Sequence, residues 1–359
     1  MTKRNDKVVV AMSGGVDSSV AALQLIKQGY DVTALFMHIG VEMPPDPQNP
    51  DNTCPHESDD ARAMADRLNI PFVVAEFKTE FEPILDYFAD EYLLGRTPNP
   101  CVLCNRTIKF GRLLDYARSL GARYFATGHY ARITRDDTIC RLRKALYRPK
   151  DQSYVLYGLD REILPNLLFP NGELTKQQVR QLAEQFGLHV ADKPDSQDIC
   201  FAPDGNYARL VRQRRPEAFR EGPILDQTGR ELGRHAGLAH FTIGQRRGLG
   251  VAMGIPYYVT AIDRNRNAVI IGPADELLAD ELIAANPRWL VDPPAAPCRA
   301  TVKIRYAHPG APATIEPLEN NRLHVRFDQP QRAITPGQSA VFYDDDIVLG
   351  GDIIETAPQ

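Results

Sequence analysis

The chain has 359 residues, more than one typical domain needs, so we expect two or three domains. Hydrophobic and charged fractions of 43% and 25% are typical of a soluble globular protein. No apolar run approaches the roughly 20 residues that span a bilayer, and the first residues have no apolar signal region behind them, so we expect a cytoplasmic protein without a membrane partner.

Residues 7 to about 130 alternate between strand and helix patterns. This alternation predicts an α/β domain built on a doubly wound parallel sheet, which binds ligands at the carboxyl ends of its strands. The predicted strands are 7–12, 31–38, 71–77 and 123–127, and the predicted helices are 16–28, 57–69, 79–94 and 105–119.

The first loop, AMSGGVDSS at residues 11–19, joins an apolar strand to a helical pattern. A glycine turn there points backbone N–H groups into one concavity at the positive end of the helix, which favours a phosphate chain. We expect Gly14 and Gly15 to allow close approach of the oxygens, and Asp17 to hold Mg²⁺ bound to them. Further donors are expected from the hydroxyls of Ser13, Ser18 and Ser19.

This loop lacks the Gly-Lys-Ser/Thr ending of a Walker A loop, so transfer of a γ-phosphoryl group is not expected. It resembles the SGGxDSS pyrophosphate loop (PP-loop) of the ATP pyrophosphatase superfamily. Members of that superfamily adenylate a carbonyl-type oxygen and release pyrophosphate.

From about residue 205 the predicted strands become short and the turns frequent, as at 226–229 and 263–267. Alternating runs at 300–306 and 323–327 predict a small antiparallel barrel at the end of the chain. We therefore predict an N-terminal α/β domain at 1–204, a central mixed or β domain at 205–282 and a β-barrel domain at 283–359.

Net charge is −4, so bulk charge does not indicate a nucleic-acid partner, but two segments are strongly basic. Residues 132–150 carry seven Arg and Lys residues against two Asp, and residues 209–220 carry five Arg against one Glu. Such segments fit either a surface for the phosphate backbone or an ordinary solvated face.

Six cysteines are too few for a disulfide scaffold at this length. Cys101 and Cys104 form a C-x-x-C motif after two prolines, and we expect a new helix to start near Asn105. Cys104 would then lie at a helix N-terminus beside Arg106 and Lys109, and both effects favour its thiolate. The motif could also be half of a zinc site, but the chain has no second pair to complete one.

Cys200 lies in a third segment, DSQDICF at residues 195–201. Alone it would be read as a buried structural cysteine. Together with Cys104 and the nucleotide loop it becomes a candidate reactive thiol.

The whole chain resembles the tRNA-specific 2-thiouridylases (MnmA/TrmU type). The resemblance runs from end to end and is carried in order by SGGVDSS (13–19), GRTPNPCVLCNRTIKF (95–110), ATGHYAR (126–132), KDQSYVL (150–156), DSQDICF (195–201), FTIGQRRGLG (241–250), KIRY (303–306) and PGQSAVFY (336–343).

The resemblance implies ATP-dependent 2-thiolation of the wobble uridine (position 34) of tRNA, with Cys104 as nucleophile, Cys200 as persulfide carrier and a Cys104–Cys200 disulfide after transfer. It implies tRNA and a persulfide-donating relay protein or cysteine desulfurase as partners, with 1–204 as the catalytic PP-loop domain and 205–282 as a tRNA-binding domain. The implied ATP contacts are Ala11, Met12, Ser13, Gly14, Gly15, Val16, Asp17, Ser18, Met37 and Gly128. The implied contacts with tRNA or the target base are Asn99, Pro100, Cys101, His129, Lys150, Asp151, Gln152, Arg305, Tyr306 and Gln338.

Cys101 departs from the family, since many members carry Asp at this position. A thiol does not copy a carboxylate at neutral pH. One alternative is an iron–sulfur cluster held by Cys101, Cys104 and Cys200, and another is a different adenylating synthetase of the same superfamily. Arg305 and Tyr306 raise a further problem, because neighbours on the predicted strand 300–306 point to opposite faces.

Overall fold

The computed structural model describes residues 6–40, 58–136, 139–188, 199–202, 205–251 and 254–356, which form two compact units. The first unit contains residues up to 82, 103–197 and 346–348, and the second contains 83–102, 198–345 and residues from 349 onward. The segment with Asn99, Pro100 and Cys101 thus belongs with the later part of the chain. The predicted boundaries near residues 204 and 282 stay a prediction.

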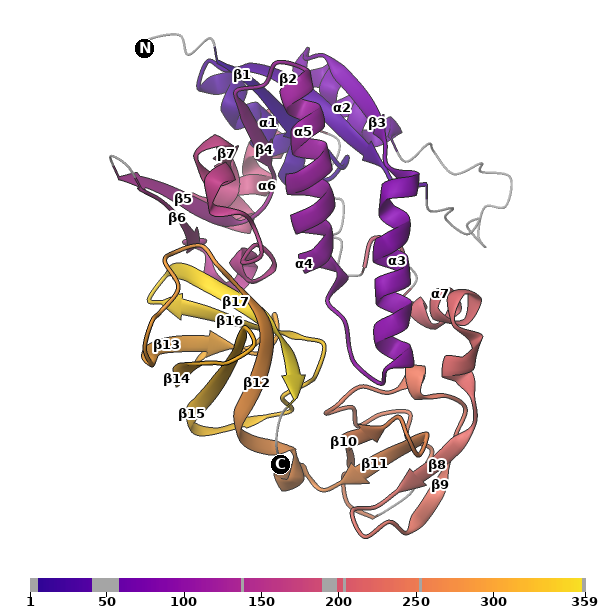
Figure 1. The fold of residues 1–359 in the computed structure, drawn as a ribbon. Helices are drawn as coiled ribbons and strands as arrows, with labels where there is room; N and C mark the ends of the chain where they lie inside the picture. Colours follow the sequence, from indigo (N-terminus) through magenta and orange to yellow (C-terminus); the bar gives the residue numbers. More distant parts are fainter. Residues whose placement is uncertain are drawn as a thin grey trace, which may run out of the picture. The chain divides into compact units, whose positions relative to one another are not determined.

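The first unit is built on a parallel sheet of five strands in the order β3-β2-β1-β4-β7 (Figure 1). The four predicted strands are confirmed, and the short strand β7 extends the sheet beyond β4. The strands are β1 (Lys7–Ala11), β2 (Asp31–His38), β3 (Phe72–Glu76), β4 (Tyr124–Thr127) and β7 (Leu167–Leu168). The helices are α1 (Val16–Lys27), α2 (Asp59–Leu68), α5 (Leu113–Ser119) and α6 (Lys176–Gln185), while α3 (Lys78–Leu93) begins in this unit and ends in the second.

Alternating strand residues cover the two faces of this sheet. Val8, Val10 and Ala126 are fully buried on one face, in a core that α1, α2 and α6 complete. Phe125 points to the other face, where its ring meets the ring of Phe110 edge to face at 5.9 Å. The predicted doubly wound arrangement is therefore confirmed.

The helix with the C-x-x-C motif starts earlier than predicted. It begins at Pro100 as α4 (Pro100–Cys104), continues as π-helical turns over Asn105–Arg112 and ends as α5. Proline at the first helical position is favourable because its missing N–H would have no partner there. The expected start near Asn105 was wrong, and Cys101, rather than Cys104, lies in the first turn.

An antiparallel hairpin of β5 (Ala131–Asp136) and β6 (Ile139–Lys144) completes the first unit. Asp346 accepts hydrogen bonds from Arg132 and Arg143, which lie opposite each other in the hairpin. All three side chains are mostly buried. Burial acts to raise the pKa of Asp346, but the hydrogen bonds and positive charges of the two arginines outweigh it and lower the pKa below its usual value.

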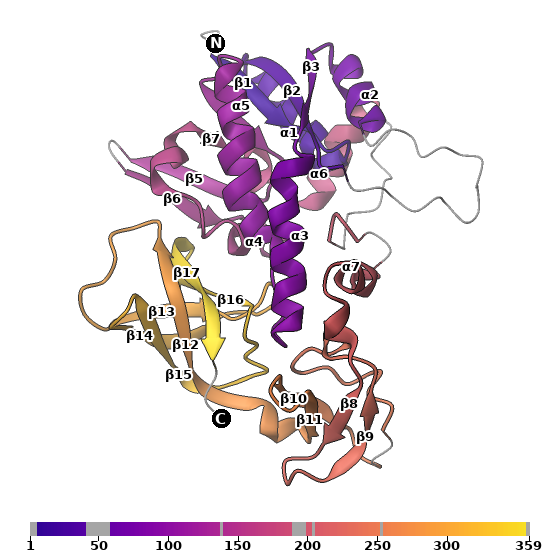
Figure 2. The same cartoon turned by 45° about the vertical axis from the view of Figure 1, so that its right-hand side comes forward.

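In the second unit, a four-stranded sheet with the order β10-β11-β8-β9 is visible beside α7 (Tyr207–Arg214) in Figure 2. Both predicted turns are confirmed as hairpin connections. Gly229 (φ +85°) closes the first and Asn267 (φ +49°) the second. The strands are β8 (Gly222–Leu225), β9 (Glu231–His235), β10 (Tyr258–Asp263) and β11 (Ala268–Gly272).

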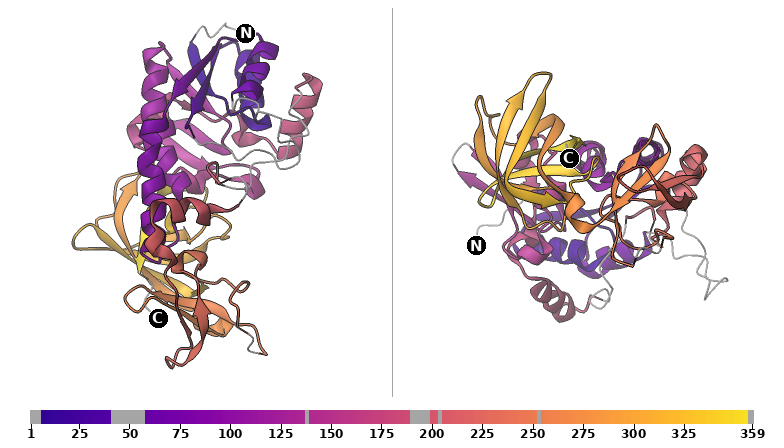
Figure 3. Two further views of the ribbon diagram at one scale, coloured as in Figure 1. Left: turned by 90° about the vertical axis from the view of Figure 1, so that its right-hand side faces the viewer. Right: turned by 90° about the horizontal axis from the view of Figure 1, so that it is seen from below.

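The same unit contains the predicted antiparallel barrel, which closes where β12 pairs with both β15 and β17 (Figure 3). The run of strand β13 ends at Lys303, so Arg305 and Tyr306 lie in the turn after it. Because they are not in a strand, Arg305 and Tyr306 need not point to opposite faces, as the predicted strand 300–306 required. The strands are β12 (Leu278–Trp289), β13 (Cys298–Lys303), β14 (Ala311–Leu318), β15 (Arg322–Arg332), β16 (Ser339–Asp344) and β17 (Ile347–Thr356).

Within the described ranges, no helix combines the length and the apolar character needed to cross a membrane.

We expect Asp346→Asn to reduce the stability of the first unit by about 2–3 kcal/mol at pH 7, because two partly buried arginines lose their partner. The folded-state pKa of Asp346 is depressed, so this contribution is present above the unfolded pKa and disappears as the pH falls through the folded value. Thermal melts of both proteins between pH 7 and pH 3 should therefore converge at the acid end.

The matched control is Asp328→Asn, which removes an exposed pair with Arg299 and should change stability far less than Asp346→Asn does. Equal losses in the two variants, or a gap that stays constant down to pH 3, would contradict this account of Asp346.

Candidate nucleotide site and reactive cysteines

The loop after β1 is shaped by its own hydrogen bonds. The hydroxyls of Ser18 and Ser19 both donate to the Gly15 carbonyl oxygen, at 3.1 and 3.0 Å. The Ser13 N–H donates to Ser18 Oγ at 3.3 Å. These serines, predicted as phosphate donors, thus fix the turn at the start of α1, whose first residue is preceded by Gly15 without a side-chain cap. The first N–H groups of α1 remain the principal anion donors of the loop.

The two loop glycines differ in whether the fold leaves room for a side chain at their position. Gly14 has φ +74°, and a Cβ there would lie 2.7 Å from Asp60 Cβ. Gly15 has φ −89°, and its Cβ would make only an ordinary contact with Ser13 Oγ at 3.5 Å. The fold therefore requires glycine at position 14, whereas at position 15 a side chain would matter only to an approaching ligand.

Gly128 follows β4 and packs directly on the first turn of α1. A Cβ at this position would lie 2.7 Å from the Ser18 nitrogen and 2.8 Å from the Asp17 carbonyl carbon. The ends of two neighbouring strands are thus brought together at one edge of the sheet, as the predicted ATP contacts required.

A cavity of about 230 Å³ opens at this edge, inside the first unit. It contains seven of the ten predicted ATP contacts, whereas Val16 is buried in the core. His129 and Gln152, predicted to contact tRNA, line the same cavity. The lining consists of Ala11, Met12, Ser13, Asp17, Ser18, Leu35, Phe36, Met37, Lys109, Leu113, Thr127, Gly128, His129 and Gln152.

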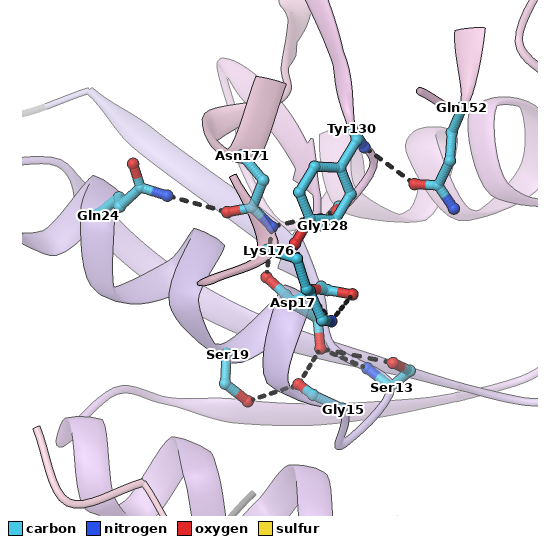
Figure 4. A network of polar contacts seen from close by, with 11 residues as sticks. Ser13, Gly15, Asp17, Ser19, Gln24, Gly128, Tyr130, Gln152, Asn171 and Lys176 are labelled. Carbon is cyan, nitrogen blue, oxygen red and sulfur yellow. Dashed lines mark hydrogen bonds and ion pairs between the residues drawn. The ribbon is translucent and has the colours of Figure 1, made fainter. Parts of the chain in front are cut away.

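Asp17 lines this cavity, and its carboxylate accepts hydrogen bonds from Lys176 and Tyr130 (Figure 4). Lys176 Nζ donates to both carboxylate oxygens, at 2.7 and 2.9 Å, and the Tyr130 hydroxyl donates to Oδ1 at 2.7 Å. The Asp17 side chain is 34% exposed and that of Lys176 only 12%. The carboxylate predicted to hold Mg²⁺ is therefore already neutralised by a mostly buried ammonium group.

A buried amide joins the segments around the cavity. Asn171 Nδ2 donates to the carbonyl oxygens of Asp17 (2.8 Å) and Gly128 (3.1 Å), and its Oδ1 accepts from Gln24 Nε2 at 2.9 Å (Figure 4). These three partners lie in the first unit, and the Asn171 side chain is fully buried. Loss of this amide would leave two backbone carbonyls without their buried donor.

The His129 ring contacts the rings of Phe110 (5.8 Å) and Phe169 (6.1 Å), which also contact each other, and its Nδ1 lies 2.7 Å from Thr127 Oγ1. Burial, together with the nearby charge of Lys109, lowers the pKa of His129 well below its usual value. The ring is therefore neutral at physiological pH and is suited to hydrogen bonding rather than to holding a charge.

Two of the neighbouring residues predicted to contact tRNA, Asp151 and Gln152, form hydrogen bonds within the first unit. The Asp151 carboxylate is buried and accepts from the Ala145 N–H, the Ser153 N–H and the Ser153 hydroxyl. Gln152 Oε1 accepts from the Tyr130 N–H at 2.9 Å. Lys150 is partly exposed. Contact of these three residues with tRNA stays a prediction.

The three cysteines of the candidate chemistry differ in setting. Cys104 belongs to the first unit and is buried, with 8% of its surface exposed. Cys101 and Cys200 belong to the second unit and are exposed. Since the helix begins at Pro100, the effect of its N-terminus acts most strongly on Cys101.

Cys200 lies in a turn over residues 199–202, which the Ala202 N–H closes by donating to the Ile199 carbonyl oxygen at 2.8 Å. The next residue, Phe201, is buried and meets the fully buried ring of Phe88 on α3 edge to face at 5.1 Å. The turn is thus fixed at Phe201 and presents Cys200 to solvent. Residues 195–198 of the predicted segment lie outside the described part of the chain.

The segment before Cys101 is bonded to the barrel. Gln338 Nε2 donates to the carbonyl oxygens of Thr97 (3.0 Å) and Pro98 (3.3 Å), and the Thr97 N–H donates to Pro336 O at 3.0 Å. Gln338, predicted to contact tRNA, therefore orients the stretch that leads to Asn99 and Pro100. Among the other predicted contacts, Tyr306 is 43% exposed and Arg305 donates to the Arg332 carbonyl oxygen.

Many arginines of the two basic segments bind acids or carbonyls of the chain itself. Arg141 pairs with Asp136, and Arg143 with Asp346. On α7 and just after it, Arg214 pairs with Asp86 and Arg215 with Asp90, two acids of α3. The expected basic surfaces are therefore narrower than the charge runs indicated, while Arg148 is exposed.

Three residues of this network, Tyr130, Asn171 and Lys176, were not predicted from the sequence. Tyr130 lies in a quoted motif without an assigned role, and Asn171 has the local pattern of a loop. The sequence Thr175–Gln178 does form a capping box, which predicts that α6 starts at Lys176. Nothing local indicates that the side chain of Lys176 reaches Asp17.

Three family models match the chain in succession. Their descriptions are "tRNA methyl transferase HUP domain" over residues 6–204, "tRNA methyl transferase PRC-barrel domain" over 209–273 and "Aminomethyltransferase beta-barrel domain" over 279–354. The first alone covers more than half of the chain.

Curated relatives match over nearly the full length. A tRNA-specific 2-thiouridylase MnmA of Acetivibrio thermocellus is 47% identical over 97% of this chain and 99% of its own. The proteins of the same name from Carboxydothermus hydrogenoformans (48%, covering 97% of each chain) and Clostridium perfringens (46%, covering 99% of each) are similar. The chain therefore belongs to the family of the tRNA-specific 2-thiouridylases.

Proposed function

We propose that this protein is a tRNA-uridine 2-sulfurtransferase. It replaces the C2 oxygen of the wobble uridine, at position 34 in the anticodon loop, by sulfur and converts ATP to AMP and pyrophosphate. The observation that carries the proposal is the phosphate-binding loop with its cavity, in a chain that is about 47% identical over its length to relatives with this name.

Sulfur transfer fits the residues better than the methyl transfer in the descriptions of the family models. A methyl donor does not require a loop that receives pyrophosphate, and it gives Cys104 and Cys200 no task. An adenylated oxygen and a sulfur nucleophile use both features. The loop and the exposed thiol of Cys200 therefore favour the name of the curated relatives.

In the first step of the proposed reaction, the C2 oxygen of uracil attacks the α-phosphorus of ATP, and pyrophosphate leaves. The N-terminus of α1 would bind the departing pyrophosphate, while Gly128 and Met37 would border the nucleotide. Mg²⁺ at Asp17 would neutralise phosphate charge when bound. The oxygen of the base is then bonded to AMP, which makes it a good leaving group for the second step.

In the second step, a persulfide on Cys200 attacks C2 with its terminal sulfur and AMP leaves. The Cys104 thiolate attacks the inner sulfur, which breaks the S–S bond and forms a Cys104–Cys200 disulfide. A thiol reductant restores the two cysteines, and a sulfur-relay protein or cysteine desulfurase reloads Cys200. The cytoplasm, where tRNA and such donors occur, is the proposed location.

For tRNA binding, the proposed contacts remain Asn99, Pro100, Cys101, Lys150, Arg305 and Tyr306, together with His129, Asp151, Gln152 and Gln338. The neutral ring of His129 beside the nucleotide cavity would suit contact with a base flipped out of the loop. Arg148, exposed in the turn before Lys150, adds a candidate phosphate contact.

We expect Cys200→Ala to release pyrophosphate from ATP in the presence of tRNA at nearly the wild-type rate while forming no 2-thiouridine, because adenylation precedes sulfur transfer. Pyrophosphate assay and nucleoside analysis of the same reaction measure the two steps. Cys298→Ala, a half-buried thiol in β13, is the matched control and should thiolate normally. Thiolation by the Cys200 variant would remove this residue from the mechanism.

Cys101→Asp separates the persulfide route from an iron–sulfur cluster. The persulfide route predicts that this variant keeps most of its thiolation activity, since many members of the family are expected to carry Asp there. The measurements are the thiolation activity of the variant and the visible absorbance of the purified protein, which reports an iron–sulfur cluster. Joint loss of activity and of a brown chromophore would favour the cluster instead.

Arg148→Ala should weaken tRNA binding a few-fold and reduce the slope of log affinity against log salt by about one, as expected for one lost phosphate contact. Arg118→Ala, an exposed arginine paired with Asp115 on α5, is the control and should leave the slope unchanged. The proposed contact fails if binding by the Arg148 variant follows the wild-type salt dependence.

A further inference from the structure

The acid in the first turn of α1 is a problem for a phosphate site. Asp17 lines the cavity that the N-terminus of the helix faces, and an isolated carboxylate there would repel a triphosphate and compete for the same positive helix end. Its charge is balanced by Lys176, whose ammonium group contacts both carboxylate oxygens. A positive charge in direct contact with the first turn of α1 therefore comes from a residue 159 positions later in the chain, in addition to Lys109, which lines the cavity.

The position of Lys176 is fixed by the fold. It is the first residue of α6, whose start is set by reciprocal bonds between Thr175 and Gln178. Val179 and Ala183 of the same helix are fully buried in the core that also contains Val20 and Ala22 of α1. The backbone of Lys176 is thus held against α1, while its long side chain ends one hydrogen bond from an atom that lines the cavity.

Tyr130 completes the arrangement. Its hydroxyl donates to Asp17 Oδ1, so the carboxylate keeps a hydrogen-bond donor even when the ammonium group moves. A lysine head is a mobile point charge, and a small rotation exchanges a carboxylate oxygen for a phosphate oxygen. The network in Figure 4 is therefore suited to hand the ammonium group from Asp17 to an incoming anion.

We propose that Lys176 is a binding residue for the pyrophosphate part of ATP, held on Asp17 before the nucleotide binds. The proposal rests on the proposed use of ATP but on no part of the thiolation chemistry.

The test is calorimetric titration of the full chain with Mg-pyrophosphate and with AMP. Lys176→Met should weaken pyrophosphate binding by at least about tenfold, the usual effect of one lost charge-assisted bond, and AMP binding by less than about twofold. Lys176→Arg should recover most of the affinity. Lys27→Met, which removes a lysine at the far end of α1, is the matched control and should bind as wild type.

A second pair of variants separates direct binding from mere charge balance. If Lys176 contacts phosphate, Lys176→Met weakens pyrophosphate binding about as much in an Asp17→Asn background as in the wild type. If it only neutralises Asp17, the substitution has no effect in that background, and the proposal is overturned. Should Lys176→Met fail to fold by circular dichroism, Lys176→Gln replaces it in both backgrounds.

The outcomes distinguish this proposal from the proposed function. A wild-type chain that binds neither pyrophosphate nor ATP would overturn the nucleotide site and this proposal together. Wild-type binding that Lys176 does not influence would overturn this proposal alone. Binding that depends on Lys176 supports it even if the chain does not thiolate tRNA.

Discussion

The candidate nucleotide site depends on how closely the backbone of Gly128 approaches the first turn of α1. No Cβ fits between them, and the amide of Asn171 bonds to the carbonyl of each. This contact brings the end of β4, the loop after β1 and the helix N-terminus to one edge of the sheet. In any parallel sheet the carboxyl ends of the strands lie at one edge. Here the close contact of Gly128 with α1 also joins two of these ends into one surface. The cavity, the position of Asp17 and the reach of Lys176 all follow from it.

Most of the arginines in the two basic segments of the sequence are paired with acids or carbonyls of the chain itself. The arginines after residue 131 bind Asp346, Asp136 and backbone carbonyls, and those near residue 215 bind acids of α3. These bonds hold a hairpin and a helix in place. A basic run in the sequence therefore identifies structural arginines as readily as it identifies a surface for RNA, and individual exposed residues such as Arg148 are better candidates.

The sheet could be predicted from the sequence because each of its elements has a local pattern. The expected helix 16–28 ends one residue later than α1, and the expected strand 31–38 coincides with β2. The start of α4 at Pro100 could not be predicted, because the sequence does not distinguish a proline before a helix from a proline at its first position. The bonds of Asn171 and Lys176 to Asp17 join residues 154 and 159 positions apart, and no local pattern records such distances.

The bonds around Thr97 have a consequence for how the protein is made. Thr97 needs Pro336 and Gln338, and the backbone of Gln338 in turn accepts from the Ile354 N–H in the last strand. On the ribosome, the stretch leading to Cys101 is therefore synthesised long before its partners exist. It reaches its final geometry only when nearly the whole chain has emerged. A prematurely terminated product would therefore lack the bonds that fix the segment before Cys101.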